Sequence, residues 1–387
     1  MLVCKIRWRL IKVARLMGEI LGRLKERNSK VELLRIISMW FIVAHHFVIH
    51  NADPISVFPG TVVRMVLHGV LYPSGRIAVA VFFIITVWYL ADAQLTLKGQ
   101  LRRAWILLGQ MLFYSVPLVL FFGLFEAGDG LQAGELMTAV FAPLASLWWF
   151  PTVYILLILV APYLFDGLRA LTSRRLGELC ALLVVLYGVL PVVPYSTIGG
   201  FVSSLTGQTV VIACVTCWFK WHYRGGAGPR VLVLPVLSYV AVYVCYFVAQ
   251  KDVPLLSAFA SSVYGSVVTN PANLLSLAIA LPVCLFVFNA QPAHWPAVNY
   301  LATLSFGVYL ATDSVYMEEV LWKNLLVFSH CHPAWGLLSV MLVVTGVYAA
   351  ASCVEAVRQV LYRALFKHPG RAFDVLWDKI AGVSLPK

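Results

Sequence analysis

The sequence predicts an all-α integral membrane protein, a bundle of about ten transmembrane helices with both termini in the cytoplasm. Of its 387 residues, 61% are hydrophobic and only 12% are charged, whereas a soluble domain is about 45–50% apolar and about 25% charged. The apolar residues gather in stretches of about 17–22 residues, the length of a helix that crosses a bilayer. Because backbone polar groups in lipid must be paired within their own segment, these stretches are expected to be helices.

The distribution of basic residues supports this class and its orientation. The formal net charge is +12, and the lysines and arginines lie in short loops and tails between the apolar stretches, which is the positive-inside pattern. All strong basic clusters fall on the same side when the spans are counted along the chain. We therefore expect a multi-pass protein of the cytoplasmic membrane, whose positive charge meets anionic lipid headgroups and not nucleic acid.

Each predicted span is bounded by basic residues or by a loop rich in polar residues and prolines. Residues 51–75, which include Pro54, Pro59 and Pro73, are expected to form an outer loop after the first span. Tryptophans near the predicted span ends are expected to act as interfacial anchors, namely Trp148, Trp149, Trp295, Trp322 and Trp335. In chain order the spans cover residues 33–49, 76–91, 104–125, 148–165, 179–195, 202–219, 231–250 and 274–288, a ninth that starts near Tyr300, and 336–355.

The charge and hydropathy patterns divide the chain into three regions. Residues 1–30 form a basic amphipathic segment, because apolar residues recur at helical spacing among arginines and lysines over residues 10–24. A helix of that kind is expected to lie on the inner membrane face. Residues 31–356 form the transmembrane domain, and residues 357–387 form a basic cytoplasmic tail.

The first predicted span carries an unusual set of polar residues. Ten residues separate Arg35 from His46, so the two side chains differ by only about 20° around a helix axis and lie about 16 Å apart along it. Glu32 stands one turn before Arg35 and can hold it by an ion pair. Ionisable residues within a span usually face a polar cavity, where a neutral imidazole can act as a base and a guanidinium can grip a phosphate.

The residues alone leave other interpretations open. Arg35 could be one more basic flank whose side chain extends to the headgroups, and His45, His46 and His50 could be interfacial residues. His45 also competes with His46 for the role of base, although it lies about 100° away around the helix and so does not share the face of Arg35.

Four motifs in order resemble acyltransferase family 3, the integral-membrane sugar O-acyltransferases. The first is the Arg-ten residues-His spacing of Arg35 and His46, with Glu32 at the usual acidic position. The resemblance extends over residues 32–355. The other motifs are Val81-Phe82-Phe83-Ile84-Ile85, then Trp148-Trp149-Phe150 with Tyr154 and Pro162, then Ser305-Phe306-Gly307-Val308-Tyr309-Leu310.

Two departures from the family pattern affect residues near these motifs. Thr86-Val87-Trp88 stands where the family usually has Ser-Gly followed by an aromatic residue, and the lost glycine would alter close packing between helices. Ala311-Thr312-Asp313 stands where the family often has a histidine. Asp313 can still supply a polar group at that point.

The resemblance implies an enzyme that moves an acyl group, most often acetyl, from acyl-CoA to a hydroxyl of an envelope or exported glycan. His46 would be the general base, and Arg35, held by Glu32, would bind the donor. Asp313, Trp149 and Tyr154 are the further substrate-binding candidates. The expected partners are acyl-CoA as donor substrate, a glycan or lipid-linked sugar as acceptor, and membrane lipids, with no permanently bound cofactor and no metal, in a chain compatible with a homo-oligomer.

The alternative is a multi-span transporter or lipid-linked sugar flippase without acyl chemistry, and a membrane scaffold without chemistry is a third class. The sequence shows no paired halves with broken helices at matching positions, which is the usual pointer to a transporter. Acyl transfer from acyl-CoA by the purified protein would separate the first class from the other two.

Overall fold

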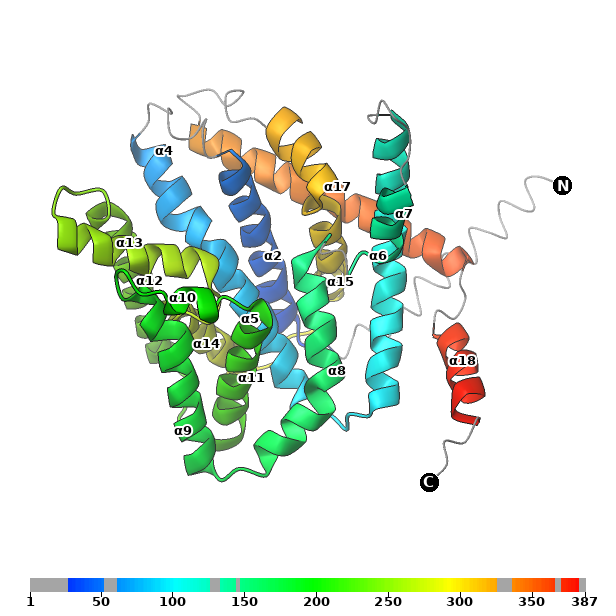
Figure 1. Ribbon diagram of the computed structural model, residues 1–387, viewed down its shortest axis with the longest axis horizontal. Coiled ribbons are helices and arrows are strands. Elements are labelled where there is room, and N and C mark those ends of the chain that lie inside the picture. Colours follow the sequence, from blue (N-terminus) through cyan, green and yellow to red (C-terminus); the bar gives the residue numbers. More distant parts are fainter. Residues whose placement is uncertain are drawn as a thin grey trace.

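The computed structural model describes residues 27–51, 61–125, 133–143, 147–325, 336–365 and 370–382. Throughout these ranges the regular structure is helical and no strand occurs (Figure 1). Most of the predicted amphipathic segment 1–30 lies outside the described residues. The helices are α2 (Ser29–His50), α4 (Thr61–Val66), η1 (Leu67–Leu71), α5 (Tyr72–Leu90), α6 (Leu97–Phe125), α7 (Ala133–Val140), α8 (Trp149–Arg169), α9 (Ser173–Val184), η2 (Val185–Val189), η3 (Leu190–Val192), α10 (Ile198–Phe201), α11 (Leu205–His222), η4 (Pro229–Leu232), α12 (Val233–Val248), α13 (Pro254–Thr269), α14 (Leu274–Asn289), α15 (Pro296–Thr312), α16 (Val315–Met317), η5 (Glu318–Leu325), α17 (Gly336–Leu365) and α18 (Arg371–Gly382).

Seven helical segments within the described ranges are long and apolar enough to cross a membrane. An eighth is added if α13 and α14, which meet at a bend of 47°, form one broken span. The all-helical membrane architecture is therefore confirmed. Each of the ten predicted spans overlaps a helix, but several of these helices are short, so the count of about ten and the cytoplasmic position of both termini stay predictions.

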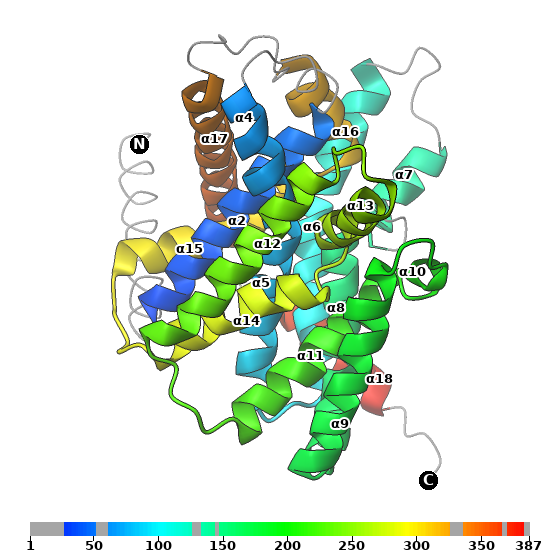
Figure 2. The same ribbon diagram turned by 90° about the vertical axis from the view of Figure 1, so that its left-hand side faces the viewer.

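Helix α2 lies inside the bundle, where it packs against α5, α15, α17 and α14 (Figures 1 and 2). Its first turn is capped by Asn28, whose side chain accepts a hydrogen bond from the backbone N–H of Lys30. The hydroxyl of Ser29 donates to the Asn299 side chain over 2.7 Å, which ties the start of α2 to the first turn of α15. The two helices begin together and run in the same direction, so their C-terminal ends also meet.

The predicted outer loop over residues 51–75 is wrong for its second half. Helix α4 begins at Thr61 and passes through the π-helical turn η1 into α5, so that one apolar segment runs over Val62–Leu90. Pro73 does not interrupt this segment: it stands just after the π-helical turn η1, where the regular i→i−4 hydrogen-bond pattern has already changed. Residues 52–60 lie outside the described residues.

Two of the predicted interfacial tryptophans are core residues. Trp148 and Trp322 are both fully buried, and the indole N–H of Trp322 donates to the carbonyl oxygen of Thr312 over 3.1 Å. Proximity to a predicted span end was therefore a poor guide to their exposure. Trp295 is 49% exposed, and Trp335 lies outside the described residues.

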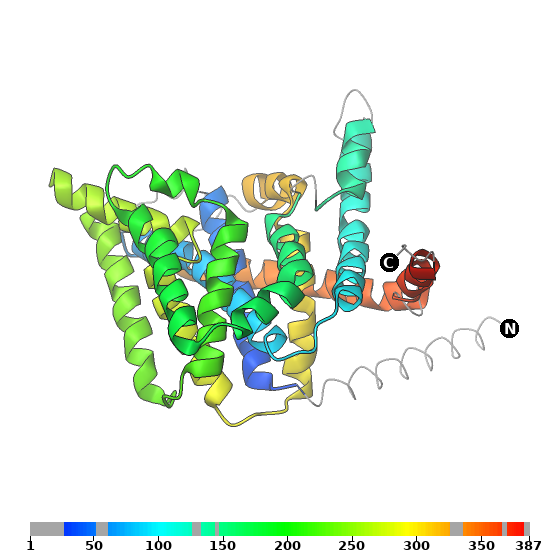
Figure 3. The ribbon, with the colours of Figure 1, turned by 60° about the horizontal axis from the view of Figure 1, so that its bottom comes forward.

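The C-terminal part contains an unpredicted short helix. Helix α17 continues past the proposed domain boundary at residue 356, and α18 then docks against the first turns of α6 at the edge of the molecule (Figures 1 and 3). Arg102 pairs with Asp374 and Lys98 pairs with Asp378, each over 3.1 Å.

Candidate active site

The C-terminal ends of α2 and α15 bring together a histidine and a carboxylate. His46 lies in the last part of α2, and Asp313 is the residue that ends α15. The Nε2 atom of His46 is 3.0 Å from Oδ1 of Asp313, and both side chains are buried. The two residues lie far apart in the sequence, so the parallel packing of the two helices creates this pair.

The pairing determines which nitrogen of His46 can act as a base. A carboxylate accepts hydrogen bonds, so the imidazole places its proton on Nε2, facing Asp313. The other nitrogen, Nδ1, then holds a lone pair, and it is buried without a hydrogen-bond partner. His46 therefore has the arrangement of a base that is held by an acid on its far side.

His45 is engaged elsewhere. Its Nδ1 donates to the backbone carbonyl of Tyr72 over 2.6 Å, and its ring stacks on the ring of Tyr72 with centroids 5.1 Å apart. The ring also stands directly against Gly75, where any side chain would overlap it. His45 and His46 thus have different partners, and the choice of His46 as catalytic residue stays a prediction.

Two neighbouring cavities lie beside His46. The larger has a volume of about 220 Å³, and the smaller has a volume of about 30 Å³. Both are lined by His45, His46, Arg76 and Trp149. Asp313 and Glu318 line only the larger cavity, whereas Met39, Val79, Phe150 and Tyr309 line only the smaller one.

The remaining predicted residues fall into two groups. Trp149 lies at the cavities, with its ring 4.7 Å from the guanidinium carbon of Arg76. Tyr154, one and a half turns further along α8, lines neither of these cavities. It lies instead close enough to Arg35 and Arg103 for their charges to act on its hydroxyl. The structure thus separates Trp149 from Tyr154.

Arg35 and Glu32 form a second polar site toward the start of α2. The Nη1 atom of Arg35 is 3.1 Å from each carboxylate oxygen of Glu32. Glu32 is buried and also receives Arg27 over 3.5 Å, while the side chain of Arg35 is 25% exposed. Arg35 thus keeps access to solvent while a buried carboxylate holds it in place.

Two residues at the cavities, Arg76 and Glu318, are not among the predicted site residues. Arg76 is the first residue of the predicted span 76–91, and a basic residue at an outer span end, which runs against the positive-inside pattern, is a signal in the sequence. Glu318 lies between the ninth and tenth predicted spans, and η5 brings its Oε1 to 3.6 Å from Nε2 of His50. Only the fold could show that contact.

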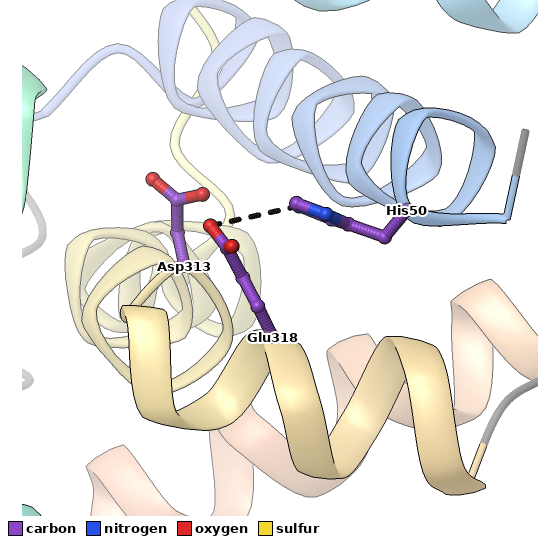
Figure 4. Close-up of side chains that lie close together, drawn as sticks. All are labelled: His50, Asp313 and Glu318. Carbon is purple, nitrogen blue, oxygen red and sulfur yellow. Dashed lines mark ion pairs between the residues drawn. The ribbon is translucent and has the colours of Figure 1, made fainter.

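His50, Asp313 and Glu318 form the one group of potential metal ligands found among the described residues (Figure 4). Their donor atoms all lie within 4.8 Å of one another. All three residues already have a protein partner, because Asp313 contacts His46 and Glu318 faces His50. A cation would compete with these pairs.

This fold and site define a helical membrane protein in which a buried histidine–carboxylate pair borders internal cavities. The chain belongs to the acyltransferase 3 family, because the model of that family, described as an acyltransferase domain, matches residues 28–353. The match extends from α2 into α17, and family membership indicates an acyltransferase. No curated protein and no solved structure matches the chain significantly.

Proposed function

We propose that this membrane acyltransferase moves an acyl group, in the simplest case acetyl, from acyl-CoA to a hydroxyl of an envelope or exported glycan. The observation that carries the proposal is the buried His46–Asp313 pair beside the cavities, within the region that the family model matches. The proposal places the acceptor on the outer side, where the charge pattern puts the C-terminal end of α2.

In the proposed reaction Nδ1 of His46 takes the proton of the acceptor hydroxyl while the oxygen of that hydroxyl attacks the carbonyl carbon of the thioester. Asp313 keeps the imidazole in the required tautomer and stabilises the imidazolium that forms. The thiolate of CoA leaves with the electron pair of the C–S bond and then receives from His46 the proton that came from the acceptor hydroxyl. A positioned base of this kind contributes about 10²–10⁴-fold to the rate.

Arg35 is proposed to bind the phosphates of the donor at the inner end of α2. Its guanidinium is partly exposed and held by Glu32, and a guanidinium binds phosphate oxygens through paired hydrogen bonds. Tyr154, near Arg35, would contact the donor at this end, and Trp149 would contact the substrates beside His46. The arm of CoA would then span the axial distance of about 16 Å between Arg35 and His46.

The test uses purified protein in liposomes with labelled acetyl-CoA and envelope polysaccharide from a strain that lacks the protein. We expect His46→Ala to lower transfer by about 10²-fold or more and His45→Ala to retain it. Loss in His45→Ala alone would overturn the assignment of the base. Uptake of sugar into vesicles without CoA, together with no acyl transfer, would instead favour a transporter.

Arg35→Met tests the donor site separately. We expect a higher KM for acetyl-CoA with a smaller change in kcat, because the contact is made equally in the ground and transition states. Arg174→Met is the matched control, since Arg174 pairs with Glu178 on the surface of α9 and its side chain is 89% exposed. An unchanged KM in Arg35→Met would exclude this role for Arg35.

A further inference from the structure

Arg76 occupies a position in the site that the proposed roles leave unused. It lies in the second turn of α5, one residue after the glycine that faces His45, and it lines both cavities next to His46. Its guanidinium carbon stands 4.7 Å above the centre of the Trp149 ring. The ring covers one face of the cation and leaves the edge with its N–H groups available for a ligand.

Among the residues that the structure describes, the Arg76 cation has no anionic partner in direct contact. In the described part of the chain no carboxylate oxygen lies within 4.0 Å of Arg76. Its Nε and Nη1 atoms are shielded from solvent and have no hydrogen-bond partner. The nearby carboxylate of Asp313 is already occupied by His46. A partly buried arginine in a membrane domain whose charge has no carboxylate in direct contact is costly unless a ligand supplies one.

The smaller cavity suggests what that ligand is. Its volume of about 30 Å³ has room for about two water-sized groups, too little for a sugar carboxylate with its ring. Much of its lining is apolar and includes Met39, Val79 and Phe150. A carbonyl oxygen and one methyl group fit a space of this size and character, beside both His46 and Arg76.

We propose that Arg76 is a catalytic residue that stabilises the oxyanion of the reacting thioester through Nε–H and Nη2–H, the two guanidinium donors that point in the same direction, with the short acyl group seated in the smaller cavity. This inference rests on the proposed acyl transfer. Two parallel N–H donors in a water-poor site are the usual means of stabilising a charge that develops on a carbonyl oxygen.

The electron flow is consistent with this role. When the acceptor oxygen forms its bond to the carbonyl carbon, the π electron pair moves to the carbonyl oxygen and the hydroxyl proton moves to Nδ1 of His46. The oxyanion then accepts two hydrogen bonds from Arg76, which keeps all of its protons. Collapse restores the C=O bond, breaks the C–S bond and releases CoA, whose sulfur receives the proton from His46.

The experiment measures kcat and KM for acetyl-CoA in liposomes, with acyl-free envelope polysaccharide from a strain that lacks the protein as acceptor. We expect Arg76→Met to lower kcat by about 10²–10³-fold, with little change in KM, because an oxyanion exists only in the transition state. Arg76→Lys keeps the charge but loses the paired donors, so we expect a smaller loss. Arg174→Met again serves as the control.

An unchanged kcat in Arg76→Met would overturn the inference. If the KM for the polysaccharide rises at the same time, Arg76 is instead a binding residue for an anionic sugar. If Arg76→Met fails to fold, Arg76→Lys decides, since full activity in that variant contradicts a need for two donors. Failure of the wild-type protein to transfer acetyl would reject the proposed function itself, whereas an active wild type with an equally active Arg76→Met rejects only this inference.

Discussion

His45 occupies the space in front of Gly75, so that the imidazole of α2 lies directly on the backbone of α5. A Cβ atom at position 75 would overlap the ring and stand 2.7 Å from its Nδ1. That nitrogen also donates a hydrogen bond to the carbonyl oxygen of Tyr72, so the ring cannot turn away without losing this hydrogen bond. The contact sets how closely α2 approaches α5, and with it the positions of His46 and Arg76.

Gly75→Ala should therefore disturb the site although it adds a single methyl group. We expect destabilisation by about 1–3 kcal/mol from overpacking and a clear loss of acyl transfer. Gly346→Ala in α17 is the matched control, because no atom lies within 4 Å of the added Cβ, and alanine favours the helix by about 0.5–1 kcal/mol. Thermal unfolding followed by tryptophan fluorescence measures the stability of both variants, and equal stability of the two would contradict the packing argument.

Asp313→Asn should impair catalysis through the tautomer of His46. The amide can donate its N–H to Nε2, which moves the imidazole proton to Nδ1 and removes the lone pair that acts as base. We expect kcat to fall by about 10²-fold or more with little change in unfolding temperature. Asp252→Asn, at an exposed turn before α13, is the control. Equal kcat in the two variants would show that Asp313 does not assist His46.

Glu355 and Arg358 of α17 form a buried ion pair, with Nε–Oε2 and Nη2–Oε1 distances of 2.6 and 2.7 Å. Tyr114 of α6 donates to the same carboxylate over 2.7 Å, and Gly307 of α15 provides the space for it. Glu355→Met leaves a buried guanidinium unpaired and should cost about 3–5 kcal/mol. The double variant with Arg358→Met should unfold at a higher temperature than Glu355→Met, and the reverse order would contradict this account.

Asp92, in the turn between α5 and α6, should contribute an acid-sensitive contact. Burial alone would raise the pKa of its carboxyl, but hydrogen bonds from Lys220 and Trp221 and the charges of Lys220 and Arg169 hold that pKa below its ordinary value of 3.8. The folded state therefore binds this proton less tightly than the unfolded state. The contribution to stability is present above the ordinary pKa and is lost as the pH falls through the lower, folded-state pKa.

Asp92→Asn should lower the apparent unfolding temperature at pH 6 by a few degrees at most, because the carboxylate side chain is 60% exposed and such pairs contribute about 1 kcal/mol or less. The difference from the wild-type protein should shrink as the pH is lowered below about 3.8. Melting curves over this pH range provide the measurement. A difference that stays constant to pH 3 would show that the effect is not ionic.

Several elements could be predicted from residue patterns because each depends on local properties. The span predicted at 33–49 lies within α2, and those at 104–125 and 274–288 lie within α6 and α14. Two of the helices that escaped prediction, α4 and α13, stand next to prolines in the sequence. A proline in the first helical turn looks like a loop signal in the sequence, yet it is well tolerated there, as Pro254 illustrates.

By itself the sequence determined that the protein is a helical membrane protein of an acyltransferase type, and that Arg35 and His46 share one helix about three turns apart. Only the tertiary structure decided that Asp313 meets His46, that Arg76 stands over Trp149 beside it, and that Tyr154 lies with Arg35 instead. The physical reason is that a span is apolar on most of its sides, so its sequence shows how long it is but not which neighbours its faces contact. Those contacts depend on close packing of small residues such as Gly75 and on buried polar pairs between helices.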